Sequence, residues 1–182
     1  MSKSVANIFD EYPILVDPVQ LMDESNRLTY FDLPVMWSEY FSETKVKTIL
    51  KLSPPKTFRV DSLMSAIDTI TEKTDKASLG SLAIILVPAL LRDDAKSLFS
   101  NFDVKREPQI MCASEVITIV EVALDKQFKV VVDGCIVAEC SEFISAFQVY
   151  LASLYLFNLC CPKNLTATLT FFQKDVLNLH ND

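Results

Sequence analysis

The side chains of this sequence that could do chemistry are its cysteines, its histidine and its adjacent carboxylates. A cysteine nucleophile needs a neighbouring base, most often histidine, to form the thiolate. The only histidine, His180, stands two residues before the last one, and we do not expect it to serve a thiol. A cysteine-dependent enzyme, with a thiol that reacts fast near neutral pH, is therefore the weakest of three functional hypotheses. The five cysteines are Cys112, Cys135, Cys140, Cys160 and Cys161.

The carboxylates also fail to form a catalytic pattern. They occur as adjacent pairs, and neighbouring side chains point apart, whereas a glycosidase or metal site needs carboxylates that converge. We expect these acids to be solvated, with Asp93-Asp94 near a helix start, where the helix dipole favours negative charge. Gly80 stands alone, so there is no phosphate-binding loop. The pairs are Asp10-Glu11, Asp23-Glu24 and Asp93-Asp94.

Metal binding is not expected either. The sequence has no CxxC motif, and Cys160-Cys161 has no histidine nearby, so it is a poor zinc arrangement. Apolar neighbours around the thiols favour buried, reduced cysteines in an intracellular protein of the cytoplasm or nucleus. We thus expect no catalytic residue, metal or cofactor, and no enzyme.

Composition and charge limit the classes of partner that the sequence favours. The chain of 182 residues is 50% hydrophobic and has a net charge of −7, which predicts a dense core, some apolar surface, or both. The densest basic cluster, Lys45, Lys47 and Lys51, is too sparse for direct nucleic-acid binding. The longest apolar run, 82–91, is too short to span a bilayer, so no membrane is expected. The first residues lack the apolar core of a secretory signal.

Helical signals fill the first part of the chain. Asp17 before Pro18 resembles an N-cap with proline at the first helical position, and predicts a helix over 18–28. Its apolar residues would turn inward; these are Val19, Met22 and Leu28.

Further helices are expected towards the middle of the chain. Residues 33–52 show the helical period with a break at Ser42-Glu43. Residues 60–74 form a second amphipathic pattern, and the polar stretch 72–78 is the best internal boundary.

The apolar run at 82–87 is ambiguous. Its length and the following Pro88 favour a buried strand, although a buried helix has the same apolar character. We expect a helix over 88–99 to follow.

A β-meander is the clearest prediction. Residues 116–124, 128–132 and 135–140 are rich in β-branched side chains, which favours strands. Asp133-Gly134 between the last two is a strong hairpin signal, because a type I′ turn needs φ > 0 at both central positions. We expect three antiparallel strands over about 116–140.

A long apolar helix is expected over 141–159, capped by Ser141. It is hydrophobic nearly all round, which indicates either a central core helix or an interface. A last helix, capped by Asn164, carries one apolar stripe of Leu165, Leu169, Phe172, Val176 and Leu179. Apolar side chains of the 141–159 helix are the candidate interaction surface, namely Phe143, Phe147, Tyr150, Leu154 and Phe157.

A family resemblance covers the C-terminal third. The segment FKVVVDGCIVAEC, then Leu156-Phe157-Asn158-Leu159, Cys161-Pro162-Lys163 and Phe171-Phe172-Gln173-Lys174, resembles the C-terminal region of uncharacterised, mobile-element-associated animal proteins labelled sterile-alpha-motif-domain-containing-3-like. Cys161 departs from the aromatic more usual there. The resemblance implies a mobile-element-related protein and no catalytic residue or cofactor.

Together these patterns predict an α+β fold. N-terminal helices would accompany a small antiparallel meander covered by two C-terminal helices, in one domain over 1–182, with a division into 1–76 and 77–182 as the alternative. We expect a non-enzymatic protein-interaction or self-association domain, with a protein partner or a homodimer. The runner-up is a small-molecule or lipid-binding domain whose aromatic residues line an apolar pocket.

Overall fold

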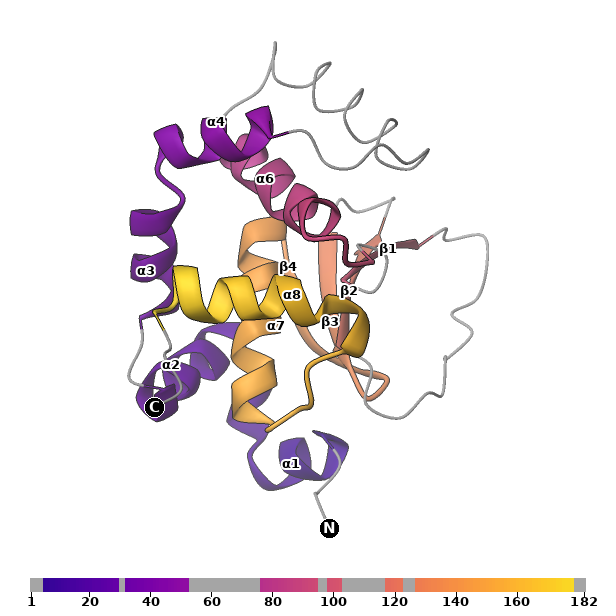
Figure 1. The fold of residues 1–182 in the computed structure, drawn as a ribbon. Helices are drawn as coiled ribbons and strands as arrows, with labels where there is room; N and C mark the ends of the chain where they lie inside the picture. The colour runs from indigo at the N-terminus through magenta and orange to yellow at the C-terminus, as the bar shows by residue number, and fades with distance from the viewer. Residues whose placement is uncertain are drawn as a thin grey trace. The chain divides into compact units, whose positions relative to one another are not determined.

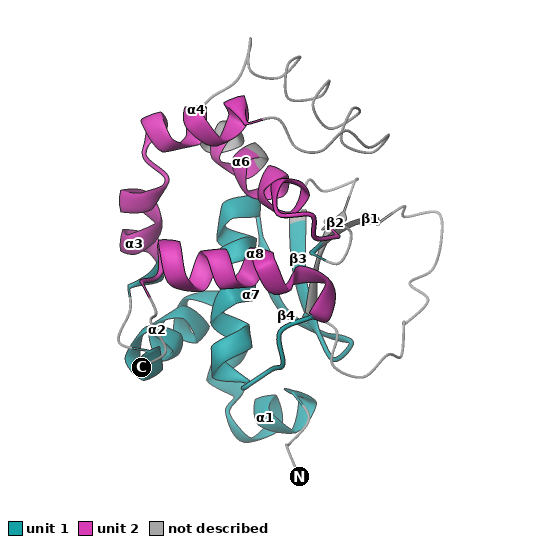
Figure 2. Ribbon diagram, in the orientation of Figure 1, with its two compact units in different colours: residues 1–33, 96–162 teal, residues 34–95, 163–182 magenta. Residues whose placement is uncertain are grey.

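The chain has an α+β fold made of two compact units (Figures 1 and 2). Unit 1 comprises residues 1–33 and 96–162, and unit 2 comprises 34–95 and 163–182. Each unit thus joins segments far apart in sequence, so the division differs from the expected boundary at 76. The computed structural model describes residues 5–29, 32–52, 76–94, 98–102, 117–122 and 127–178. The helix expected over 60–74, Cys112, Leu179 and His180 lie outside these ranges.

Unit 1 combines a sheet with helices from both ends of its sequence. Its helical elements are α1 (Val5–Glu11), the 3₁₀ turn η1 (Pro13–Val16), α2 (Pro18–Thr29) and α7 (Phe143–Leu156). Its strands are β1 (Phe99–Phe102), β2 (Ile117–Val122), β3 (Gln127–Val132) and β4 (Cys135–Cys140), in the order β1-β2-β3-β4.

The predicted meander is confirmed. The strands β2, β3 and β4 pair antiparallel in sequence order, and the β3–β4 turn places Asp133 at φ 51° and Gly134 at φ 75°, as a type I′ turn requires. The strand β1 was not predicted. It pairs parallel to β2, and it includes Phe99, where we expected a helix to end.

The core of unit 1 is built around α7. This helix contacts α2 as well as β2, β3 and β4. Its aromatic rings form a continuous row, with Phe143 edge-on to Phe128, Phe147 stacked on Phe143, and Tyr150 stacked on Phe147. At the end of the helix, Phe157 meets Phe9 of α1 edge-on. The prediction that a C-terminal helix covers the sheet is confirmed for α7, whereas the last helix belongs to unit 2.

The helix α2 is present as predicted, but its inward face is not the expected one. Asp17 Oδ1 accepts a hydrogen bond from the Val19 backbone N–H at 2.8 Å, so Asp17 caps the helix. The buried residues are Leu21 and Ser25, four apart on one side. Val19 precedes Leu21 by two residues, about 200° around the helix, and is therefore exposed, as is Leu28.

Unit 2 consists of helices only among its described residues. They are α3 (Leu33–Tyr40), α4 (Glu43–Lys51), α6 (Lys76–Leu90), the 3₁₀ turn η3 (Lys163–Leu165), α8 (Thr166–Phe171) and the π-helical turn η4 (Phe172–Val176). The predicted break at Ser42-Glu43 is confirmed, because it separates α3 from α4. Buried side chains of α4 and α6 pack together, namely Val46, Leu50, Ala83 and Leu86.

The run at 82–87 lies in the helix α6, so the strand prediction was wrong. Ile84, Leu86 and Val87 are buried and Ile85 is partly buried, and a continuous apolar run has no amphipathic period to reveal a helix. Pro88 lies inside α6, two residues before its end at Leu90, and has no backbone N–H to donate to the preceding turn. The chain then turns at Arg92, with φ 64°, so the helix expected over 88–99 is wrong for the described residues 91–94 and 98–99, which are not helical.

Unit 2 contains a cluster of stacked aromatic side chains. Trp37 stacks on Phe41 with ring centroids 4.4 Å apart and on Phe172 at 5.7 Å. The predicted C-terminal stripe is confirmed for the four members inside the described ranges, since all four are buried: Leu165, Leu169, Phe172 and Val176.

A carboxylate distant in sequence caps α8. Asp93 Oδ2 accepts a hydrogen bond from the backbone N–H of Thr168 at 2.7 Å, and the Asp94 N–H donates to the Asn164 carbonyl at 3.0 Å. The prediction that Asp93-Asp94 lies near a helix start is correct, but the helix is α8. Asn164 is not the cap, because Leu165 holds that position.

Removing this cap should destabilise unit 2. We expect Asp93→Ala to lower the free energy of unfolding by about 1 kcal/mol, because the Thr168 N–H loses its acceptor. Asp93→Asn keeps an oxygen acceptor and should lose less. Denaturant unfolding followed by the fluorescence of Trp37, the single tryptophan, measures both. Equal losses for the two variants would contradict the capping role.

Candidate interaction surface

The predicted interaction residues do not form a surface. Each of the five side chains is buried in unit 1: Phe143, Phe147, Tyr150, Leu154 and Phe157. Because α7 has α2 against it as well as three strands, its apolar excess is used within the unit. The alternative interpretation of an all-apolar helix, a central core helix, is the one that the structure has.

The hydroxyl of Tyr150 offers a test of the burial of α7. Its hydroxyl is buried without a hydrogen-bond partner in the structure, and burial, with a smaller effect from Cys161, raises its pKa. Since an unsatisfied buried hydroxyl is costly, we expect Tyr150→Phe to raise the free energy of unfolding by roughly 1 kcal/mol. The matched control, Tyr12→Phe, removes an exposed hydroxyl and should change little. A clear loss of stability in Tyr150→Phe, measured by chemical unfolding, would show that the hydroxyl is bonded.

An exposed apolar surface lies elsewhere in unit 1, on η1 and its two ends. Tyr12, Ile14, Val16 and Val19 are 57%, 61%, 53% and 65% exposed. We call these four side chains the η1 surface. Single exposed apolar residues are ordinary, but the concentration of four within eight residues makes this segment the candidate binding site.

The backbone of η1 turns two of these side chains, Ile14 and Val16, outward. Leu15 is buried, and in a 3₁₀ turn Ile14 and Val16 lie about 120° to either side of it. The Leu15 N–H donates to the Tyr12 carbonyl at 3.0 Å, and the Asp17 N–H donates to the Ile14 carbonyl at 3.2 Å. The side chains are therefore presented on a hydrogen-bonded turn.

Three elements of unit 1 hold η1 in place. It contacts α1, α2 and β4. The strand β4 adds a further half-exposed apolar side chain, Ile136. A turn supported on three sides can offer its side chains to a partner without first becoming ordered, which lowers the entropic cost of binding.

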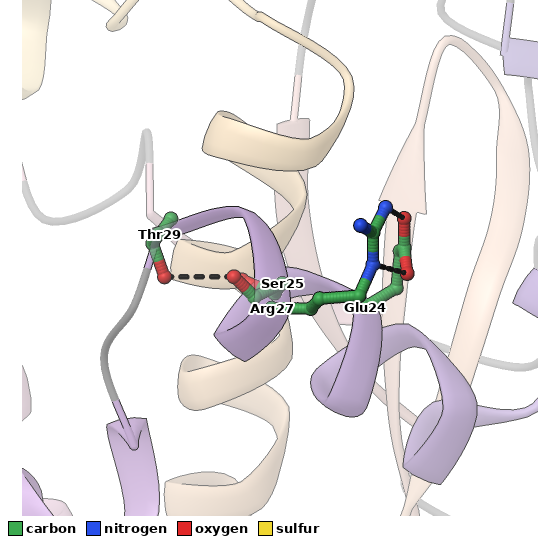
Figure 3. A network of polar contacts seen from close by, with 4 residues as sticks. All are labelled: Glu24, Ser25, Arg27 and Thr29. Atoms are coloured by element: carbon green, nitrogen blue, oxygen red, sulfur yellow. Dashed lines mark hydrogen bonds and ion pairs between the residues drawn. The ribbon is translucent and has the colours of Figure 1, made fainter.

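The charge around the η1 surface is acidic. From residue 5 to residue 26 the sequence contains five acids and neither lysine nor arginine. The next base along the sequence after this stretch is Arg27, which donates two hydrogen bonds to Glu24, at 2.8 Å and 2.6 Å (Figure 3). The hydrogen bond from Arg27 holds the pKa of Glu24 below its usual value. Four of the five acids are exposed, namely Asp10, Glu11, Asp17 and Asp23.

Sequence reasoning missed this surface, although a signal was present. Residues 12–16 read Tyr-Pro-Ile-Leu-Val, and the predicted interaction surface did not include them. A 3₁₀ turn has three residues per repeat, so a run of apolar residues within it cannot be buried on one side. An apolar run placed between two prolines thus predicts exposed apolar side chains.

The expected burial of the cysteines does not hold for all of those in the described part of the chain. Cys135, Cys140, Cys160 and Cys161 form no disulfide; the first two are partly buried and the last two are exposed. Burial raises the pKa of the Cys140 thiol, which reduces its thiolate fraction. Across the described ranges, no cluster of three or more His, Cys, Asp or Glu side chains could hold a metal ion.

The basic cluster on α4 makes contacts of its own. Lys47 Nζ lies 2.6 Å from Glu43 Oε1, and Lys45 Nζ lies over the Tyr40 ring, 3.8 Å from its centroid. These charges are thus partly offset by neighbours. No described helix is long and apolar enough to cross a membrane.

The fold and the surface define this chain as an α+β protein with an apolar turn among acidic residues. No protein-family model matches it, and neither a curated protein nor a solved structure does. The resemblance of its C-terminal third to the mobile-element-associated group therefore stays a prediction.

Proposed function

We propose that this chain is a non-enzymatic protein-interaction domain that binds its partner through the η1 surface. The observation that carries the proposal is the exposure of four apolar side chains within eight residues: Ile14 and Val16 on the hydrogen-bonded turn η1, Tyr12 just before it and Val19 in the first turn of α2. Association would remove these side chains from water, and burial of apolar surface contributes about 25 cal/mol per Å².

The proposal moves the binding site from α7 to η1. The hypothesis began from the apolar excess of the 141–159 segment, but that excess is buried. Stability and binding therefore use different residues: α7 organises unit 1, and η1 remains accessible. Substitutions on η1 should affect binding while leaving the fold intact, which makes the two roles separable.

The ligand-pocket alternative has less support. It requires aromatic side chains around a cavity, whereas Phe143, Phe147 and Tyr150 stack on one another with ring centroids 5.9 to 6.4 Å apart. These distances are those of direct aromatic contact.

Site-specific photo-crosslinking in cells tests the proposal. A photoreactive residue is placed at position 14 in one variant and at position 52 in a matched control, because Leu52 is also about half exposed but lies in unit 2. We expect a discrete protein adduct from position 14. We expect that position 52 does not give the same adduct. Absence of an adduct at position 14, or the same adducts at both positions, would contradict the proposal.

A further inference from the structure

We infer that the partner seated on the η1 surface is a protein segment that combines apolar side chains with flanking lysine or arginine. This inference rests on the proposed function and adds the chemistry of the partner. It is carried by the juxtaposition of four exposed apolar side chains with an acidic, lysine-free and arginine-free stretch of sequence.

The acids are distributed along the elements that carry the surface. Asp10 lies on α1, Asp17 joins η1 to α2, and Asp23 lies on α2; all three are exposed. Asp17 directly follows Val16 and holds the Val19 backbone N–H, so one carboxylate lies between two apolar members of the surface. A bound segment would meet apolar side chains and negative charge together.

Charge complementarity favours a basic protein segment over a second copy of the chain, a nucleic acid or an anionic membrane. A second copy docked through the same surface would bring acids against acids, and like charges across an interface oppose association. Nucleic acid would be repelled in the same way, because its affinity for proteins depends on lysine and arginine. An anionic membrane likewise attracts amphipathic elements through basic residues.

The recognition would use side chains rather than strand addition. The strand β4, which η1 contacts, is at the edge of the described sheet, and an edge strand can pair with another chain. However, the β3–β4 register shifts between Val130 and Val131, and such bulges discourage edge pairing. The side chains of the η1 surface are therefore the better contact.

A peptide titration tests the inference. The probe is a synthetic helical peptide of about 18 residues, roughly five turns, with leucine on one face and lysine at the flanks. One control peptide carries glutamate in place of lysine, and another carries serine in place of leucine. Isothermal titration calorimetry with the full chain compares all three, and sedimentation of the chain alone reports self-association.

Matched variants locate the binding. Ile14→Asp should lower the affinity for the lysine peptide about tenfold or more. Val35→Asp, at a half-exposed position of unit 2, should leave that affinity unchanged. Asp17→Asn keeps a side-chain cap for α2, since Asn and Asp cap equally well, but removes the charge. When Asp10→Asn is added, we expect the affinity for the lysine peptide to fall about three- to tenfold, and we expect this loss of affinity to be smaller at high salt.

The outcomes separate this inference from the proposed function. Preference for the lysine peptide, lost in Ile14→Asp and reduced in the Asp→Asn pair, supports both. Equal or better binding of the glutamate peptide, or a dimer that Ile14→Asp dissociates, overturns the basic partner but leaves η1 as a protein-binding surface. Failure of all peptides while position 14 crosslinks to a protein without a basic segment also overturns the inference. If no peptide binds and position 14 gives no crosslinked protein, the proposed function is overturned as well.

Discussion

Phe147→Ala should lower the free energy of unfolding of unit 1 by about 3–5 kcal/mol, the range for truncating a buried phenylalanine. The ring is fully buried and stacks on both Phe143 and Tyr150, so its removal leaves a cavity inside an aromatic row. Denaturant unfolding followed by far-ultraviolet circular dichroism, with amide exchange in α7 and β3, measures the loss.

Two control variants give this result its meaning. Phe147→Leu keeps most of the volume and should lose much less, since volume-conserving swaps in a core are better tolerated. Ile14→Ala, on the η1 surface, should change stability by no more than about 0.5 kcal/mol. If Phe147→Ala were as mild as Ile14→Ala, α7 would not be the core helix, and its side chains would again be candidates for an interface.

Phe172→Ala should have a similarly large effect on unit 2, again about 3–5 kcal/mol. Phe172 is fully buried, and its ring packs against Trp37, Phe41 and Phe171, with centroids 5.7, 6.3 and 5.3 Å apart. Since Trp37 is the single tryptophan of the chain, its fluorescence during denaturant unfolding reports the change directly.

The neighbouring residue Phe171 provides a matched control for this prediction. Phe171 is only partly buried and contacts Tyr40 edge-on at 5.9 Å, so Phe171→Ala should cost clearly less than Phe172→Ala. Equal losses in the two variants would mean that the cluster is not centred on Phe172. The comparison is internal to the same turn of helix, which removes differences in backbone propensity.

Local signals in the sequence predicted local structure well. The Asp133-Gly134 turn needs positive φ at two adjacent positions, and both residues have it. The Asp17 cap and the break at Ser42-Glu43 also follow from short-range chemistry, and both are present. Each of these features depends on a few neighbouring residues, which a sequence displays directly.

Features that depend on distant partners were harder to predict. The strand β1 pairs parallel with β2, and a parallel pair needs a long connection instead of a turn. The segment 82–87 of α6 is a continuous apolar run, so it shows no amphipathic period. The cap of α8 comes from Asp93, which is 75 residues away from Thr168 in sequence, and no local pattern points to it.

The candidate site was misplaced for a related reason. An all-apolar helix fits either a core or an interface, and only the packing of α2 and the sheet against α7 decides between them. On α2, a wrong choice of helical phase turned Val19 inward and concealed its exposure. The phase is set by Leu21, which is fully buried, and a single residue of this kind cannot be identified from spacing alone.

Reconstituted binding of the crosslinked partner tests the central claim most directly. Its affinity is measured for the natural chain, for Ile14→Asp with Val19→Asp, and for the matched pair Val35→Asp with Leu52→Asp, alongside the unfolding free energy of each. We predict at least about a tenfold loss of affinity for the η1 pair alone, with stability changed by no more than about 0.5 kcal/mol. Unchanged affinity in the η1 pair, or equal losses in both pairs, would contradict the account.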